Sequence, residues 1–77
     1  MKYIKFTNVY EDETVVNIAQ ITHMSEAKVM NENTIETITK IGLTNGKEVK
    51  TRLSLDDVLC MIADAESSMV YWFFKGG

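Results

Sequence analysis

The 77-residue chain contains no proline, one cysteine and one histidine. Because Cys60 has no second cysteine to pair with, an internal disulfide and a cysteine-rich zinc site are both excluded. The chain also lacks a P-loop, a GxGxxG motif and any regular spacing of metal ligands. We therefore expect no cofactor and no bound metal, and the single cysteine favours a reducing, cytoplasmic environment.

Long apolar runs and an excess of positive charge are missing as well. No run approaches the roughly 20 apolar residues of a membrane-spanning helix, and Lys5 interrupts the apolar start that a signal peptide needs. The net charge is −3 and the isoelectric point is near 5.0. A nonspecific nucleic-acid binder needs a basic face, so we expect no direct contact with nucleic acid. Because no apolar run is long enough, we also expect no membrane span.

What the chain does contain is typical of one small globular domain over residues 1–77. Apolar residues make up 45% and charged residues 25%, which excludes a disordered composition. A core of this size gives marginal stability, and oligomerisation often supplies the remainder. The titratable residues do not converge on a recognisable catalytic set, so we do not expect an enzyme.

A β-hairpin is the clearest local feature, because Asn45 and Gly46 separate two alternating runs. A three-residue loop over 44–46 places Ile41 opposite Val49, whereas a two-residue loop would mix apolar and charged faces. Its third position requires a positive φ, which Gly46 tolerates. The residues expected to face the core are Ile41, Leu43, Val49 and Leu53, and those expected to face water are Lys40, Glu48, Lys50 and Arg52.

A capped amphipathic helix follows the hairpin directly. Ser54 is a good N-cap residue, and two aspartates in the first turn suit the helix dipole. The apolar residues expected to cover the inner face of the sheet follow the i, i+3, i+4, i+7 spacing, and they are Leu55, Val58, Leu59 and Ile62. Cys60 lies at the flank of this stripe, where we expect it to be a buried small apolar side chain.

The first half of the chain predicts shorter strands and turns. Alternation over 2–7 predicts a strand with Ile4 and Phe6 inward. We expect further strands over 14–17, 22–29 and 34–43, a helical turn over 17–21 and a turn over 31–33, with a helical alternative open for 25–28. Ile38 breaks the parity of its run, which predicts a bulge or strong bend near 37–39. His23 is expected to be a structural strand residue.

The segment Met69–Phe74 is the most apolar part of the chain. It fits an additional C-terminal strand slightly better than a continuation of the helix that ends at Gly76, and both remain open. Four consecutive aromatic residues cannot all face one side of a strand or helix. We therefore expect a subunit interface, most simply a twofold dimer, formed by Tyr71, Trp72, Phe73 and Phe74.

The acidic run Glu11, Asp12 and Glu13 permits two interpretations. A solvated turn is the simpler one, because three acids alone are too few ligands for a calcium loop. The alternative is an acidic surface of a phage-type inhibitor that blocks a host nucleic-acid-binding or defence protein. In that alternative the three carboxylates would carry the contact with the basic partner.

A family resemblance adds a functional expectation. The asparagine-to-isoleucine spacing of 17–21, the Ile41–Lys47 hairpin and the 54–62 helix resemble the small bacterial FlbD/SwrD family linked to flagella and swarming. The same elements are similar in rhythm to the LytTR DNA-binding domain, but the chain is acidic. Neither resemblance carries a functional residue over to this chain.

Together these patterns predict an α+β fold. We expect a small bent antiparallel sheet with one C-terminal amphipathic helix and a possible additional strand. The expected function is a small non-catalytic interaction or regulatory module of bacterial or phage origin. Its expected partners are another protein and a second copy of the chain.

Overall fold

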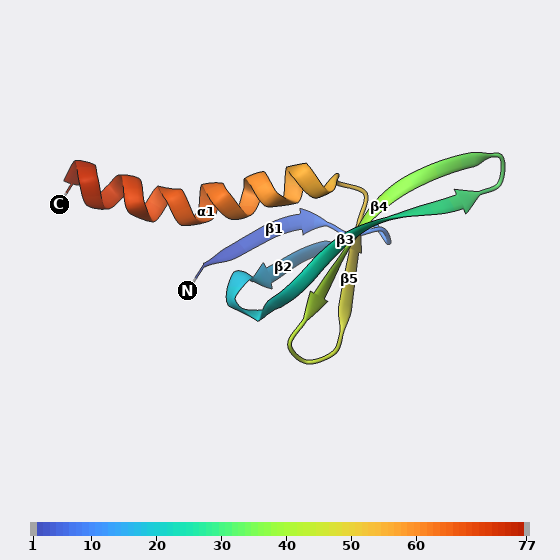
Figure 1. The fold of residues 1–77 in the computed structure, drawn as a ribbon, viewed down its shortest axis with the longest axis horizontal. Helices are drawn as coiled ribbons and strands as arrows, with labels where there is room; N and C mark the ends of the chain where they lie inside the picture. The colour runs from blue at the N-terminus through green and yellow to red at the C-terminus, as the bar shows by residue number, and fades with distance from the viewer. Residues whose placement is uncertain (1, 77) are drawn as a thin grey trace.

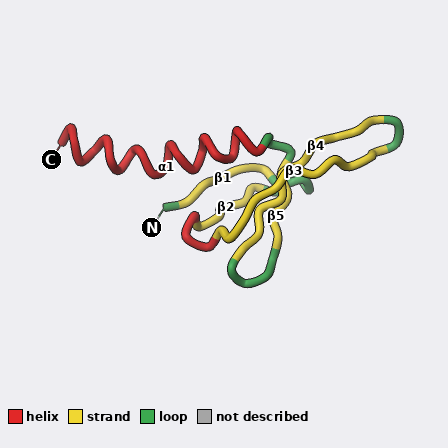
Figure 2. Tube along the Cα trace, viewed as in Figure 1, coloured by secondary structure: helices red, strands yellow, loops and turns green. Residues whose placement is uncertain are grey.

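The computed structural model describes the backbone of residues 2–76 and the side chains of residues 2–66. Its elements form an antiparallel pair, β1–β2, and a three-stranded sheet in the order β3–β4–β5, followed by one helix (Figures 1 and 2). The predicted α+β class is therefore confirmed. In chain order the elements are β1 (Tyr3–Thr7), β2 (Glu13–Asn17), the short 3-10 helix η1 (Ile18–Gln20), β3 (Ile21–Asn31), β4 (Thr34–Leu43), β5 (Glu48–Thr51) and α1 (Leu55–Gly76).

The core joins both sheets and the helix. The helix α1 packs against β1 and β3, and the buried apolar side chains come from four elements. The inward orientation predicted for residues 4, 6 and 41 is confirmed, and residues 43, 49 and 53 are partly buried against the same cluster. The members of the cluster are Ile4, Phe6, Val16, Ile41 and Val58.

The β4–β5 hairpin has the predicted register. Ile41 lies opposite Val49, and Leu43 donates its amide to the Lys47 carbonyl at 2.9 Å. The loop between them therefore has three residues, and Gly46 closes it with φ of +84°. Because a side chain is strained at this φ, glycine is needed here for the backbone conformation.

The β3–β4 pairing corrects the predicted bulge. Pairing runs without interruption from Met24 opposite Ile41 to the turn at residues 32 and 33. Of the bulge or strong bend predicted near 37–39, the bulge is therefore wrong, as is the helical alternative for 25–28. Ile38 is instead buried on the other face, in a groove that Val9 and Tyr10 also line. No bulge is needed because both faces of β4 are covered at this point.

The irregularity in β3 lies instead between Ile21 and His23, opposite Gly42. A Cβ atom on Gly42 would lie 2.2 Å from the His23 ring. A side chain at this position could not fit unless the ring moved. His23 is a strand residue, as predicted, and its ring lies over the glycine.

The helix begins as predicted but is rotated relative to the predicted stripe. The Ser54 hydroxyl accepts the Asp57 amide at 3.0 Å, which confirms the N-cap. The core-facing residues are Val58, Met61, Ile62 and Ala65. Leu59 is 45% exposed and Cys60 is also exposed, so both were wrongly predicted as core residues. Successive helical residues are about 100° apart, and only a narrow stripe meets the small sheet.

The C-terminal segment continues the helix, so the additional strand is wrong. Serine residues at 67 and 68 cost only a few tenths of a kcal/mol in a helix, and α1 contains no proline and no glycine before Gly76. The side chains of Tyr71, Trp72, Phe73 and Phe74 lie outside the described residues. No helix in the described part of the chain is long and apolar enough to cross a membrane.

Candidate interaction surfaces

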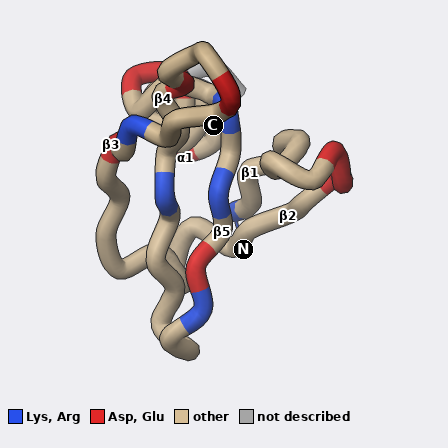
Figure 3. The backbone as a smooth tube through the Cα atoms, turned by 90° about the vertical axis from the view of Figure 1, so that its right-hand side faces the viewer, with Lys and Arg blue, Asp and Glu red and all other residues tan. Residues whose placement is uncertain are grey.

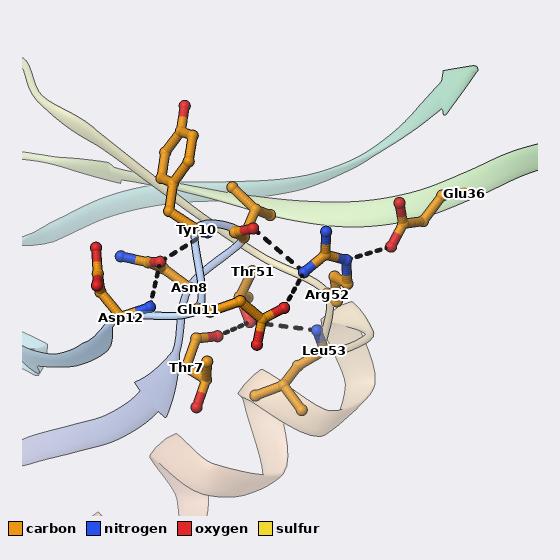
Figure 4. A network of polar contacts seen from close by, with 10 residues as sticks. Thr7, Asn8, Tyr10, Glu11, Asp12, Glu36, Thr51, Arg52 and Leu53 are labelled. Atoms are coloured by element: carbon orange, nitrogen blue, oxygen red, sulfur yellow. Dashed lines mark hydrogen bonds and ion pairs between the residues drawn. The ribbon is translucent and has the colours of Figure 1, made fainter. Parts of the chain in front are cut away.

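Arg52 joins three segments that are distant in the sequence (Figure 4). Its Nε donates to the Glu36 carboxylate at 2.6 Å, and its Nη1 donates to the Glu11 carboxylate at 3.0 Å and to the Val9 carbonyl at 3.2 Å. About half of the Arg52 side chain is exposed, so these ion pairs are screened by water. The contacts hold the β1–β2 loop against β4 and β5.

The β1–β2 loop is also ordered by Asn8. Its side-chain oxygen accepts hydrogen bonds from the backbone amides of Tyr10 at 2.8 Å and Asp12 at 3.1 Å (Figure 4). The backbone amide of Asn8 donates to the Asp12 carbonyl at 2.9 Å. Glu11 adopts a positive φ of 68° within this turn. The loop is a hydrogen-bonded structural unit, which agrees with the prediction of a turn.

Two carboxylates of the acidic run are used within the molecule. Glu11 is paired with Arg52, and Glu13 at the start of β2 is paired with Lys5 at 3.1 Å. Asp12 is in neither of these ion pairs, so the three acids differ in their contacts within the molecule. A basic partner would have to compete with Lys5 for Glu13 and with Arg52 for Glu11.

The β3–β4 hairpin forms a second surface, which sequence reasoning missed. It projects away from β1, β2 and α1 (Figure 1). Met30 and Ile35 lie opposite each other on this hairpin and are 76% and 67% exposed. Both residues are apolar, and they lie on either side of the turn and on one face of the hairpin. This pattern is a signal that could have identified the surface from the sequence. Apolar side chains exposed together in this way are typical of interaction surfaces.

One edge of the three-stranded sheet also belongs to this surface. β3 is the terminal strand of the sheet and lies at one margin of the molecule in Figure 3, whereas β5 is bridged by Asn8 on its outer side. Most β3 side chains are exposed, including those of Glu26, Lys28 and Val29. An edge strand of 11 residues offers its backbone groups to a pairing partner.

The single histidine and the metal-ligating side chains are the remaining chemically reactive groups of the described residues. The His23 Nδ1 lies 2.9 Å from the Thr22 hydroxyl, and both side chains are exposed. No group of three or more histidine, cysteine or acidic side chains in residues 2–66 is arranged to hold a metal ion. The candidate interaction surfaces are the β1–β2 loop with its acidic residues and the β3–β4 hairpin with the edge of β3.

Comparisons with protein-family models, with curated proteins and with solved structures find no match to this chain. The resemblance to the FlbD/SwrD family and to LytTR domains therefore stays a prediction.

Proposed function

We propose that this chain is a small non-catalytic interaction or regulatory module, of bacterial or phage origin, that self-associates and contacts a protein partner. The proposed contact segment comprises Tyr71, Trp72, Phe73 and Phe74. The cytoplasm is the proposed location. The proposal rests on exposed surface rather than on a reactive site.

The length of α1 is the observation that carries this proposal. The helix packs against β1 and β3 near its start, whereas its C-terminal end lies beyond the N-terminal end of β1 (Figure 1). The sequence places its aromatic residues in this distal part, after Met69. A helix segment that extends past the sheet has no sheet surface beneath it, and aromatic residues are enriched in protein interfaces.

Sedimentation equilibrium of the full chain at micromolar concentration tests the proposal. We expect an average mass above the 8.8 kDa of one chain, and a lower average mass for the variant Trp72→Ala/Phe74→Ala. Tyr10→Ala is the matched control, because it removes an exposed aromatic side chain from the β1–β2 loop instead. Its mass should equal that of the wild type.

Two results would overturn the proposal. One is a wild-type monomer whose Trp72 fluorescence does not change on dilution. The other is an average mass that stays the same after both aromatic residues are removed. Circular dichroism of each variant must show an intact fold for the comparison to hold.

A further inference from the structure

The free edge of β3 carries a charge pattern that is complementary to itself. Glu26 and Lys28 are exposed and lie on the same face of the sheet, on either side of Ala27. The three ion pairs among the described side chains involve neither of them. Within the sheet their cross-strand neighbours are the uncharged Thr39 and Thr37.

Two copies of an edge strand can pair in antiparallel fashion only about a twofold axis perpendicular to the sheet. Each allowed register then has one residue opposite its own copy. With Ala27 on the axis, Glu26 lies opposite Lys28 of the second copy, and the reverse pair is made on the other side of the axis. Opposite charges directly across a strand pair are stabilising.

The neighbouring registers lack this complementarity. An axis through Glu26 brings two glutamates together, and an axis through Lys28 brings two lysines together. An axis at Ser25 or Val29 sets each charge opposite an uncharged residue or, in one case, a second glutamate, Glu32. Like charges directly opposite each other destabilise a strand pair, so among the registers centred on residues 25–29 the charges select the one centred on Ala27.

The same register also covers apolar surface. Met30 of one copy lies opposite Met24 of the other when Ala27 is on the axis. Met24 packs against the hydrophobic core, whereas Met30 is 76% exposed in the single chain. Pairing therefore places the exposed methionine of each hairpin beside the edge of its partner's core. Apolar contact and charge pairing select the same register.

We infer that the β3 edge is the docking surface for a second copy of this chain, which pairs antiparallel about Ala27 and joins the two sheets into one of six strands. This inference deepens the proposed function, on which it rests for self-association, by naming the partner and the register. It adds to the aromatic segment a second, separate self-association surface, and the two surfaces together form an assembly larger than a dimer.

Charge reversal tests the inference in the Trp72→Ala/Phe74→Ala background, where the aromatic segment does not contribute. We expect this background to be a dimer held by the β3 edge alone, with a lower average mass than the wild type. Glu26→Lys sets two lysines opposite each other at both pairs, and Lys28→Glu sets two glutamates there. Each single reversal should weaken the dimer about tenfold or more, and the double reversal Glu26→Lys/Lys28→Glu should restore it.

Mixing provides a control that folding defects cannot imitate. The Glu26→Lys chain has two positive charges on its edge and the Lys28→Glu chain has two negative charges. We expect the two weakly associating variants to form a heterodimer with each other at concentrations where neither dimerises alone. Glu48→Lys, a charge reversal of an exposed residue on β5, is the matched control and should leave the mass unchanged.

A disulfide tests the position of the axis. Ala27→Cys in a Cys60→Ser background should form a symmetric crosslink under mild oxidation, because residues opposite each other on antiparallel strands lie within disulfide reach. Thr37→Cys in the same background is the control and should not crosslink, because Thr37 lies on β4 and β3 separates it from the edge.

The outcomes separate this inference from the proposed function. A monomeric aromatic variant together with an oligomeric wild type would overturn the β3 pairing and leave the proposed function standing. Association that is insensitive to both single charge reversals would also overturn the pairing, and it would indicate another occupant of the edge, such as a strand from a different protein. A wild-type monomer would overturn both.

Discussion

Thr39 and Thr51 lie directly opposite each other on β4 and β5, and both are fully buried. Neither hydroxyl bonds to the other. The Thr39 hydroxyl donates to the Leu53 carbonyl at 2.7 Å, and the Thr51 hydroxyl donates to the Thr7 carbonyl at 3.0 Å. This pair therefore ties the three-stranded sheet to the end of β1 and to the segment that leads into α1.

Replacing Thr51 should be costly for this reason. Thr51→Val keeps the shape but removes the donor of the part-buried hydrogen bond to the Thr7 carbonyl, and the Leu53 amide loses its acceptor at 3.3 Å. We expect a loss of about 1–3 kcal/mol in the free energy of unfolding, measured by urea denaturation. Thr51→Ser retains the hydroxyl and should lose less. Equal losses for valine and serine would show that the hydrogen bonds are unimportant.

Because of the orientation of α1, we expect alanine substitutions at the neighbouring residues Val58 and Leu59 to differ in their effect on stability. Val58 is fully buried, so Val58→Ala should destabilise by about 1.5–3 kcal/mol through lost apolar burial and a residual cavity. Leu59 is 45% exposed, and Leu59→Ala should cost less than about 1 kcal/mol although it removes more atoms. Thermal denaturation of the two variants decides between this orientation and the predicted stripe. A larger loss at Leu59 would favour the predicted stripe.

Gly46 should resist substitution because of its φ alone. No atom lies within 4 Å of a Cβ built there, so only the backbone conformation at +84° opposes a side chain. Gly46→Val should cost about 1–2 kcal/mol, and Gly46→Asn less, because asparagine enters the left-handed region more readily. Denaturant midpoints of the two variants provide the measurement. The expectation is wrong if the asparagine variant is the less stable of the two.

Arg52 should control the order of the β1–β2 loop more than global stability. Arg52→Lys removes the forked donors that reach Glu36, Glu11 and the Val9 carbonyl together. We expect amide hydrogen exchange at Val9 and Glu11 to accelerate several-fold, while the midpoint of global unfolding changes little. Lys5→Arg, at the other surface ion pair, is the control. Unchanged exchange in the loop would show that Asn8 alone orders it.

Local patterns in the sequence were sufficient for the elements near strong signals. The Asn45-Gly46 loop, its register and the Ser54 cap depend on residues close together in the chain, because turn geometry and capping are local interactions. Alternation similarly predicted that Ile4 and Phe6 face inward. For the same reason, the sequence established an α+β protein with a helix after the last hairpin.

Long-range packing decided the remainder. The β1–β2 loop crosses β5 and shares a groove with Ile38, so a residue of the opposite parity is buried without a bulge. The face of α1 that meets the sheet was set by β1 and β3, which left Leu59 exposed. Glu11, Glu36 and Arg52 come together only in the folded chain. The free edge of β3 likewise exists only because the strand order ends there, and no local pattern specifies which strand remains unpaired.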